Sequence, residues 1–226
     1  MKVRIKICCI KSISEALTAI ELGADAIGLV GKMPSGPGPI PDELIKQVAA
    51  AVPPPVATFL LTSETSATEI INHHHRTNTN TIQLVDLLSE GTYSMIKEAL
   101  PSVKIVQVIH VIDHKSVELA IRLSESVDAL LLDSGNPNLK IKELGGTGRV
   151  HDWKLSREIR DNSRCPVFLA GGLNAENIRE AIEQVQPYAI DVCSGVRTDG
   201  ALDKNKLKAF IANSQTVEVP GLRIWK

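Results

Sequence analysis

Eight short runs rich in valine, isoleucine and leucine recur along the chain, and this repetition restricts its fold more than any other feature. They occupy residues 3–9, 25–30, 55–61, 80–85, 103–111, 127–133, 166–170 and 189–193. Each run has the length of a strand, and stretches with helical spacing lie between them. Eight strands alternating with helices in 226 residues predict a single α/β domain over residues 1–213, a (β/α)8 TIM barrel.

Two of the intervening segments show the helical design most clearly. In residues 14–22 we expect Ser12 or Ser14 to cap the helix and Gly23 to end it. The side chains predicted to face inward there are Ala16, Leu17, Ile20 and Ala24. A later segment repeats the pattern, with Asn174 as its N-cap. A doubly wound sheet is the main alternative fold, but the Gly-rich turn expected after its first strand is missing here.

Charge and composition exclude several classes of function. The net charge is −1 and aromatic residues make up 3% of the chain, so neither a basic surface nor a stacking platform for nucleic acid is expected. No apolar run approaches the roughly 18 residues needed to span a bilayer, and the first residues lack the pattern of a signal peptide. We therefore expect a cytoplasmic protein without nucleic-acid or membrane partners.

Neither the cysteines nor the histidines have the spacing of metal ligands. The chain has four cysteines, Cys8, Cys9, Cys165 and Cys193. They lack C-x-x-C spacing and are interpreted as free thiols. Neighbouring strand side chains point to opposite faces, so we expect Cys9 to point away from the side that Cys8 faces. The run His73-His74-His75 is interpreted as a solvated helix end, and no metal site is predicted.

Two strands end in side chains that can transfer protons. In the first run Val3, Ile5 and Ile7 alternate with polar residues, which directs Lys6 and Cys8 into the barrel. A buried lysine needs a partner or water, and its charge would favour a thiolate nearby. The sixth run ends in Asp133, and strand ends carry the catalytic residues of barrels. A salt-bridged lysine, an inert cysteine and a capping aspartate remain the structural alternatives.

Glycine-rich segments follow three of the predicted strands. Gly146 and Gly148 lie in the long loop after the sixth strand, which could act as a lid on a bound substrate. The loops after strands seven and eight form the recurrent phosphate site of this architecture. The residues predicted to bind phosphate are Gly171, Gly172, Ser194 and Gly195.

Together these segments resemble the phosphoribosylanthranilate isomerases of tryptophan biosynthesis. The matching pieces are Lys6-Ile7-Cys8, Glu21 to Gly28, Leu131-Leu132-Asp133, Gly145 to Gly148 with Asp152-Trp153, Ala170 to Asn174, and Asp191 with Ser194-Gly195-Val196. They follow the family's order and spacing over most of the chain. The resemblance implies an Amadori rearrangement of a small phosphorylated substrate, without metal or cofactor. It also implies that Asp133 is the general acid, that Cys8 is the base at C2, and that Asp191 lies near the substrate's amine.

The chain departs from the family pattern in places that concern the aromatic part of the substrate. The family has Gly where this chain has Cys9, and the arginine that holds the anthranilate carboxylate aligns with Gly38. The family's Gln-Leu-His-Gly is Gln83-Leu84-Val85-Asp86 here, and its Glu after Ser-Gly-Val is Arg197. Lys32, Arg149 and Arg197 are the candidate replacement cations. Of these we favour Lys32 as a substrate-binding residue, together with Lys6, Asp191, Gly146 and Gly148.

The resemblance leaves the substrate and the assembly open. A paralogous isomerase of another phosphorylated sugar amine and a non-catalytic barrel that binds a phosphorylated metabolite are the alternatives. If phosphoribosylanthranilate is not turned over, Gly38→Arg is expected to create or improve the activity. Residues 214–226 are too apolar for a free terminus, and we expect this tail to dock on the barrel or on a partner subunit, in a monomer or a homodimer.

Overall fold

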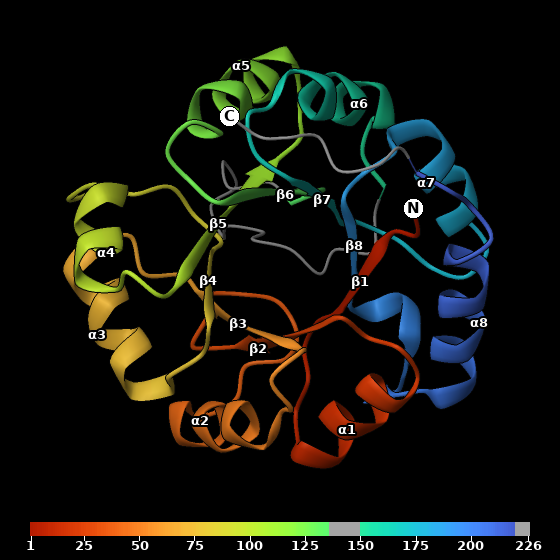
Figure 1. Cartoon of the computed structure of the whole chain (residues 1–226), viewed down its shortest axis with the longest axis horizontal. Helices are drawn as coiled ribbons and strands as arrows, with labels where there is room; N and C mark the ends of the chain where they lie inside the picture. The colour runs from red at the N-terminus through yellow and green to blue at the C-terminus, as the bar shows by residue number, and fades with distance from the viewer. Residues whose placement is uncertain (136–149, 220–226) are drawn as a thin grey trace.

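Eight parallel strands close into a barrel, as the sequence predicts. The computed structural model describes residues 1–135 and 150–219. The strands are β1 (Arg4–Ile7), β2 (Ala26–Val30), β3 (Ala57–Thr62), β4 (Thr81–Leu84), β5 (Lys104–His110), β6 (Ala129–Asp133), β7 (Val167–Leu169) and β8 (Ala189–Val192). Each strand pairs with the next, and β8 pairs with β1 to complete the ring (Figure 1). Each predicted run contains one of them, except that β3 extends one residue beyond its run, to Thr62.

Helices surround the ring, one after each strand of the barrel (Figure 1). They are α1 (Ile13–Glu21), α2 (Asp42–Ala51), α3 (Ala67–Thr77), α4 (Tyr93–Ala99), α5 (His114–Leu123), α6 (Trp153–Asn162), α7 (Ile178–Val185) and α8 (Lys204–Ser214). Between β8 and α8 the chain forms a 3-10 turn, η1 (Ser194–Val196), and a small hairpin of β9 (Arg197–Thr198) and β10 (Ala201–Leu202). None of the helices described is long and apolar enough to cross a bilayer.

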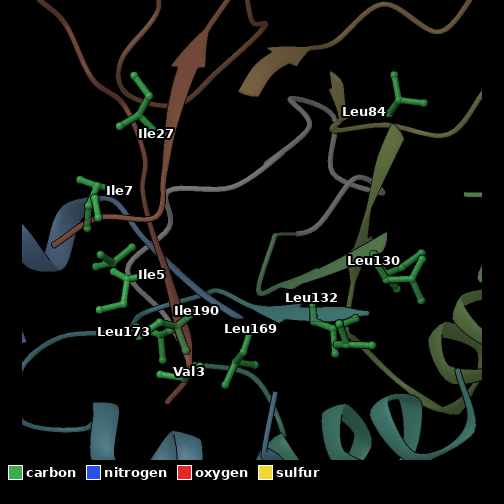
Figure 2. Close-up of a cluster of buried hydrophobic side chains, with 14 of the residues drawn as sticks. Val3, Ile5, Ile7, Ile27, Leu84, Leu130, Leu132, Leu169, Leu173 and Ile190 are labelled. Atoms are coloured by element: carbon green, nitrogen blue, oxygen red, sulfur yellow. The ribbon is translucent and has the colours of Figure 1, made fainter. Parts of the chain in front are cut away.

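The protein has two apolar clusters, an outer layer between the strands and the helices and an inner one inside the barrel. Residues 3, 5 and 7 of the first strand region are almost fully buried and join the outer layer, beneath the helices (Figure 2). The intervening Lys6 and Cys8 face the interior, as the alternation predicts. The same alternation in β6 sends Leu130 and Leu132 outward and places Leu131 and Asp133 inside. Strand periodicity thus determines which side chains reach the mouth.

The prediction for α1 is correct in its cap and wrong in one core position. Ser12 is the N-cap, and its hydroxyl accepts a hydrogen bond from the Glu15 amide at 3.1 Å. Ala16 is buried as expected, but Leu17 is 41% exposed. Ala19 takes the expected place of Leu17 in the core because it lies three residues after Ala16, on the same helical face.

The histidine run is not solvated as predicted, because α3 extends through it and turns two of the rings into the protein. His73 and His74 are both buried. The His73 ring lies 2.9 Å from the Thr62 hydroxyl and 3.1 Å from an Asp42 carboxylate oxygen. The His74 ring donates to the Thr79 carbonyl at 2.7 Å. These contacts tie α3 to β3 and α2, so the run has a structural role.

The first residues of the tail pair with the amino terminus. Lys2 and Glu218 form an antiparallel bridge, and the Val219 amide donates to the Met1 carbonyl at 2.9 Å. Residues 220–226 lie outside the described residues, so the docking of the complete tail stays a prediction.

The packing predicts unequal costs for two similar truncations on helices. Ile182 of α7 is fully buried, whereas Leu17 of α1 is exposed. Ile182→Ala should lower the free energy of unfolding by about 2–5 kcal/mol, because it removes buried methyl groups and leaves a cavity. Leu17→Ala should stay within about 0.5 kcal/mol of the wild type. Urea unfolding of both variants measures the difference, and equal losses would contradict the packing described.

Candidate active site

A pocket opens at the carboxyl ends of the barrel strands and collects most of the predicted residues. Cys8 follows β1, Asp133 ends β6, and Asp191 lies in β8. Gly171, Gly172 and Ser194 complete this part of the wall. Together with the open space at its mouth, the pocket encloses about 720 Å³ outside the protein atoms.

Cys8 reaches the pocket because the backbone continues the line of β1 past its last strand residue. Its amide donates to the Val192 carbonyl at 2.8 Å, and its side chain lines the pocket although only 5% of the residue is exposed. Gly28 of β2 makes room for it. A Cβ at position 28 would lie 2.8 Å from the Cys8 sulfur and 3.0 Å from Lys6 Nζ, so both side chains use the space that glycine leaves.

Lys6 forms a buried ion pair with Asp191 below the pocket floor. Nζ lies 2.9 Å from Asp191 Oδ1, and the lysine is completely buried. Nζ also lies 5.1 Å from the centre of the Phe59 ring, a favourable cation–π position. Burial opposes the charge, but the attraction of Asp191 and the proximity of Cys8 raise the pKa of Lys6. The lysine is therefore a fixed positive charge behind the thiol, without direct access to the pocket.

Asp133 is a buried carboxyl that favours its protonated form. Burial raises its pKa, and the nearby Asp191 carboxylate adds to this effect. A hydrogen bond from the Ser134 amide to Oδ1 at 2.7 Å opposes the shift, as do the charges of His110 and Lys6. The net direction is upward, which suits a group that must carry a proton before it donates one.

His110 is a neighbour of Asp133 that sequence reasoning missed. It ends β5 directly beside Asp133 in the strand register. Its Nε2 donates to the Val85 carbonyl at 3.1 Å, while Nδ1 is buried without a hydrogen-bond partner among the described residues. The available signal was its place as the last residue of a strand, next to the strand that ends in Asp133.

The glycine loops after β7 and β8 lie against each other beside the pocket. Gly171 and Gly172 have φ of +82° and +64°, a left-handed conformation that glycine adopts without strain. A Cβ on Gly195 would collide with the Leu173 carbonyl oxygen, so only glycine allows the two loops to meet. Of the four residues predicted to bind phosphate, three line the pocket, and Gly195 packs behind them.

The orientation predicted for Cys9 is wrong. β1 ends at residue 7, and Cys9 has φ +61°, so strand alternation no longer applies to it. Its side chain lines the pocket next to Cys8 and Cys193, and its sulfur lies 3.6 Å from the Pro37 carbonyl oxygen. Its contact with Cys193 and with Cys8 raises the pKa of Cys9, whereas the pKa of Cys193 is lowered. Three thiols therefore share this wall.

Neither of the two described candidates for the replacement cation, Lys32 and Arg197, lines the pocket. Arg197 is excluded, because its guanidinium is occupied by Glu15 and by backbone carbonyls. Lys32 is exposed and lies in an adjacent groove with Glu64 and Asp86. Arg149 falls outside the described residues.

The lid glycines cannot be placed in this site. Gly146 and Gly148 both lie within residues 136–149, outside the described residues, so their proposed role stays a prediction. In the ranges 1–135 and 150–219, no three His, Cys, Asp or Glu side chains are grouped as metal ligands.

An arginine at position 38 does not fit this backbone. Gly38 has φ +96°, and a Cβ there would lie 2.8 Å from the Cys9 Cβ. In this loop conformation Gly38→Arg would therefore strain the backbone and push against Cys9. The gain of activity expected for this substitution stays a prediction.

Comparison with known proteins identifies relatives of this chain. Residues 5–213 match the family described as PRAI, N-(5'phosphoribosyl)anthranilate (PRA) isomerase. The N-(5'-phosphoribosyl)anthranilate isomerase of Methanosarcina acetivorans is 34% identical over 224 residues, covering 93% of this chain and 92% of the relative. The corresponding isomerase of Thermotoga petrophila is 31% identical, with 94% and 98% covered.

Solved structures of such isomerases have the same fold. The structure of the Thermotoga maritima isomerase has a TM-score of 0.78 and 30% identity, covering 95% of this chain and all of that one. Another, at 0.75 and 28% with the same coverage, contains reduced 1-(o-carboxyphenylamino)-1-deoxyribulose 5-phosphate.

The raised pKa of Asp133 predicts that this residue costs stability at neutral pH. A carboxyl whose folded pKa exceeds its unfolded pKa binds more protons in the folded state, so its contribution to stability falls as pH rises between the two values. Asp133→Asn should therefore raise the melting temperature at pH 7. The gain should disappear as the pH falls below the pKa that Asp133 has in the folded protein and then below the pKa that it has in the unfolded protein. Thermal melts across pH measure it.

Asp42→Asn is the matched control because its shift has the opposite sign. Burial opposes ionisation of Asp42, but Arg76 and His73 hold its pKa below the ordinary value. Its replacement should lower the melting temperature at pH 7, with the loss fading in acid. A loss for Asp133→Asn at pH 7 would contradict the argument.

Proposed function

The chain belongs to the N-(5'-phosphoribosyl)anthranilate isomerase family, and we propose from this premise that it converts N-(5'-phosphoribosyl)anthranilate into 1-(o-carboxyphenylamino)-1-deoxyribulose 5-phosphate. The observation that supports this most is the presence of Cys8 and Asp133 in one pocket, on strands far apart in the ring. The reaction needs an acid and a base at different atoms of one sugar, and two separate strand ends supply them.

The chemistry is a set of proton transfers without net oxidation. Asp133 gives its proton to the ribose ring oxygen, the bond from that oxygen to C1 breaks, and C1 becomes doubly bonded to nitrogen. The Cys8 thiolate then removes the proton from C2, and the electron pair forms a C1=C2 bond while the C1–N bond becomes single. The resulting enol becomes the C2 ketone as its hydroxyl proton leaves, the C2=O bond forms and a proton returns to C1. The raised pKa of Asp133 favours the protonated form from which it donates, and Lys6 places a positive charge beside Cys8.

The glycine loops supply an anchor for the phosphate. We assign Gly171, Gly172 and Ser194 to direct contact, since they line the pocket, and Gly195 to the close packing of the loops. Backbone N–H groups at such a turn bind an anion without a cationic side chain. Asp191 faces the same pocket, where its carboxylate can accept a hydrogen bond from the substrate's amine.

A related substrate is the second candidate, and one observation favours it. No lysine or arginine lines the pocket among the described residues, so a carboxylate on the aromatic ring has no evident partner there. A phosphorylated sugar amine without that carboxylate would fit the same acid, base and phosphate anchor.

Assembly and location are extensions of this proposal. One solved structure contains monomers made from the dimeric Thermotoga maritima isomerase, so both a monomer and a homodimer are consistent with the family. We place the enzyme in the cytoplasm, where small phosphorylated metabolites and reduced thiols occur together.

Replacing the acid or the base tests the proposed chemistry. Cys8→Ala and Asp133→Asn should each lower kcat by about 10²–10⁴-fold or more, because each removes a positioned proton-transfer group. Cys165→Ala, which removes a buried cysteine outside the pocket, should retain the wild-type kcat. Steady-state kinetics of the folded variants and the wild type measure these differences in kcat. Near-normal turnover by Cys8→Ala or Asp133→Asn would remove that residue from the mechanism.

Lys32 is the remaining described candidate for the aromatic carboxylate. If the Lys32 side chain swings from the neighbouring groove to the pocket, Lys32→Ala should raise KM about tenfold and change kcat less. A tenfold change in affinity is what the loss of about one charge-assisted hydrogen bond would cause. Lys46→Ala, an exposed position on α2, is the control for the loss of one surface charge. Equal KM values in the two variants would exclude Lys32 and favour the second substrate.

A further inference from the structure

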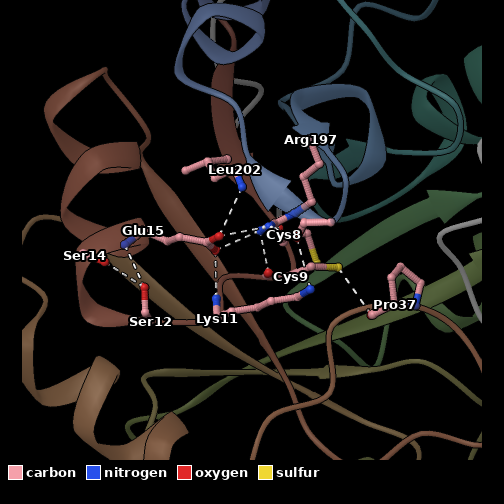
Figure 3. Close-up of polar contacts among 10 residues, drawn as sticks. Cys8, Cys9, Lys11, Ser12, Ser14, Glu15, Pro37, Arg197 and Leu202 are labelled. Atoms are coloured by element: carbon pink, nitrogen blue, oxygen red, sulfur yellow. Dashed lines mark hydrogen bonds and ion pairs between the residues drawn. The ribbon is translucent and has the colours of Figure 1, made fainter.

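Arg197 is a buried arginine that touches the turn carrying the base, not the pocket itself. It follows η1 and begins β9, and its side chain is only 6% exposed. Its Nη2 donates to the Cys8 carbonyl at 3.3 Å and also to the Cys9 carbonyl (Figure 3). Nη1 donates to the Gly200 carbonyl at 3.1 Å. The guanidinium thus satisfies two carbonyls of the turn after β1 from one planar group.

Glu15 holds this guanidinium in place from the first turn of α1. Its two carboxylate oxygens lie 3.2 and 3.1 Å from the two terminal nitrogens of Arg197. The same carboxylate accepts hydrogen bonds from the Lys11 amide at 3.0 Å and from the Leu202 amide at 3.1 Å (Figure 3). Burial opposes ionisation of Glu15, but hydrogen bonds from Arg197 and from these amides keep its pKa below the ordinary value. The pair is fixed in geometry and in charge.

The turn that Arg197 holds is intrinsically unfavourable. Cys9 has φ +61°, and this left-handed conformation is unfavourable for a residue other than glycine. The turn also brings the Cys8 and Cys9 carbonyls close enough for one nitrogen of Arg197 to donate to both. Buried carbonyls without donors would add a further cost. The guanidinium compensates for both and thereby fixes the backbone from which the Cys8 side chain projects.

The backbone of Arg197 belongs to the other half of the site. The residue comes immediately after the η1 turn, whose first residue, Ser194, lines the pocket. Its carbonyl accepts a hydrogen bond from Lys206 Nζ at 2.9 Å, which ties it to α8. Arg197 therefore links the segment assigned to the phosphate with the segment that carries the thiol.

We infer that Arg197, oriented by Glu15, is a positioning residue that holds the Cys8 turn at a fixed distance from the Ser194 turn. This rests on the proposed function, in which Cys8 removes the C2 proton of a substrate anchored by its phosphate. Displacement of a base by about 1 Å can cost about 10²-fold in rate. Because Arg197 does not line the pocket, its loss should affect kcat and leave binding nearly unchanged.

Arg197→Lys tests this inference, since a single ammonium keeps the charge opposite Glu15 but cannot reach both carbonyls. We expect kcat to fall about 10–100-fold, while KM stays within about threefold. Calorimetric titration with reduced 1-(o-carboxyphenylamino)-1-deoxyribulose 5-phosphate should give one site per chain, as in the wild type. A merely structural role would lower the number of binding sites in proportion to kcat.

Arg160→Lys is the matched control. Counted as whole residues, Arg160 of α6 and Arg197 are each 8% exposed. It likewise pairs with a carboxylate, of Asp161, and donates to a backbone carbonyl, of Gln186. It lies outside the pocket, so Arg160→Lys should keep the wild-type kcat per binding site. Glu15→Gln is the second variant if Arg197→Lys does not fold, and it should lower kcat without changing KM.

Three outcomes would overturn the inference. They are an unchanged kcat in both Arg197→Lys and Glu15→Gln, a raised KM at constant kcat, and a loss of binding sites equal to the loss of kcat. Failure of the proposed function is recognised separately. If Cys8→Ala remains active, Cys8 is not the base, whereas an inactive Cys8→Ala together with a fully active Arg197→Lys rejects only the positioning role.

Discussion

The buried ion pair of Lys6 and Asp191 is the interaction on which the rest of the structure depends. The two residues are direct partners across the seam where β8 closes onto β1. Removing one member of such a pair would leave an uncompensated charge in the barrel, which is strongly destabilising. The pair also sets the electrostatics of the pocket, because it places a cation beside Cys8 and a carboxylate near Asp133. Barrel closure and proton chemistry therefore share one interaction.

The site carries several features that are unfavourable for folding and useful for proton transfer. Asp133 is a carboxyl buried next to another acid, and Cys9 adopts a left-handed backbone conformation. Strain and shifted pKa values commonly coincide at active sites. Here the compensation comes from residues outside the pocket, in particular the Arg197–Glu15 pair beneath the Cys8 turn. The arrangement separates the groups that touch the substrate from those that hold them.

Local patterns in the sequence predict the strands, but they cannot predict the contacts between distant segments. Alternation along β1 correctly placed Lys6 inside, but its partner Asp191 lies 185 residues away. The same alternation failed at Cys9, because the strand had already ended and the backbone changed conformation. The sequence predicts a solvated helix end for the histidines of α3, whereas partners on β3 and α2 make the burial of His73 favourable. Residue types could not reveal those partners.

The central claim is that one pocket combines an acid, a base and a phosphate anchor for isomerisation of a phosphorylated sugar amine. Its most direct test is turnover of N-(5'-phosphoribosyl)anthranilate by the purified wild-type protein, measured with increasing inorganic phosphate. The account predicts turnover that phosphate inhibits competitively. Absence of turnover by folded protein that still binds phosphate in this pocket would contradict the claim for this substrate.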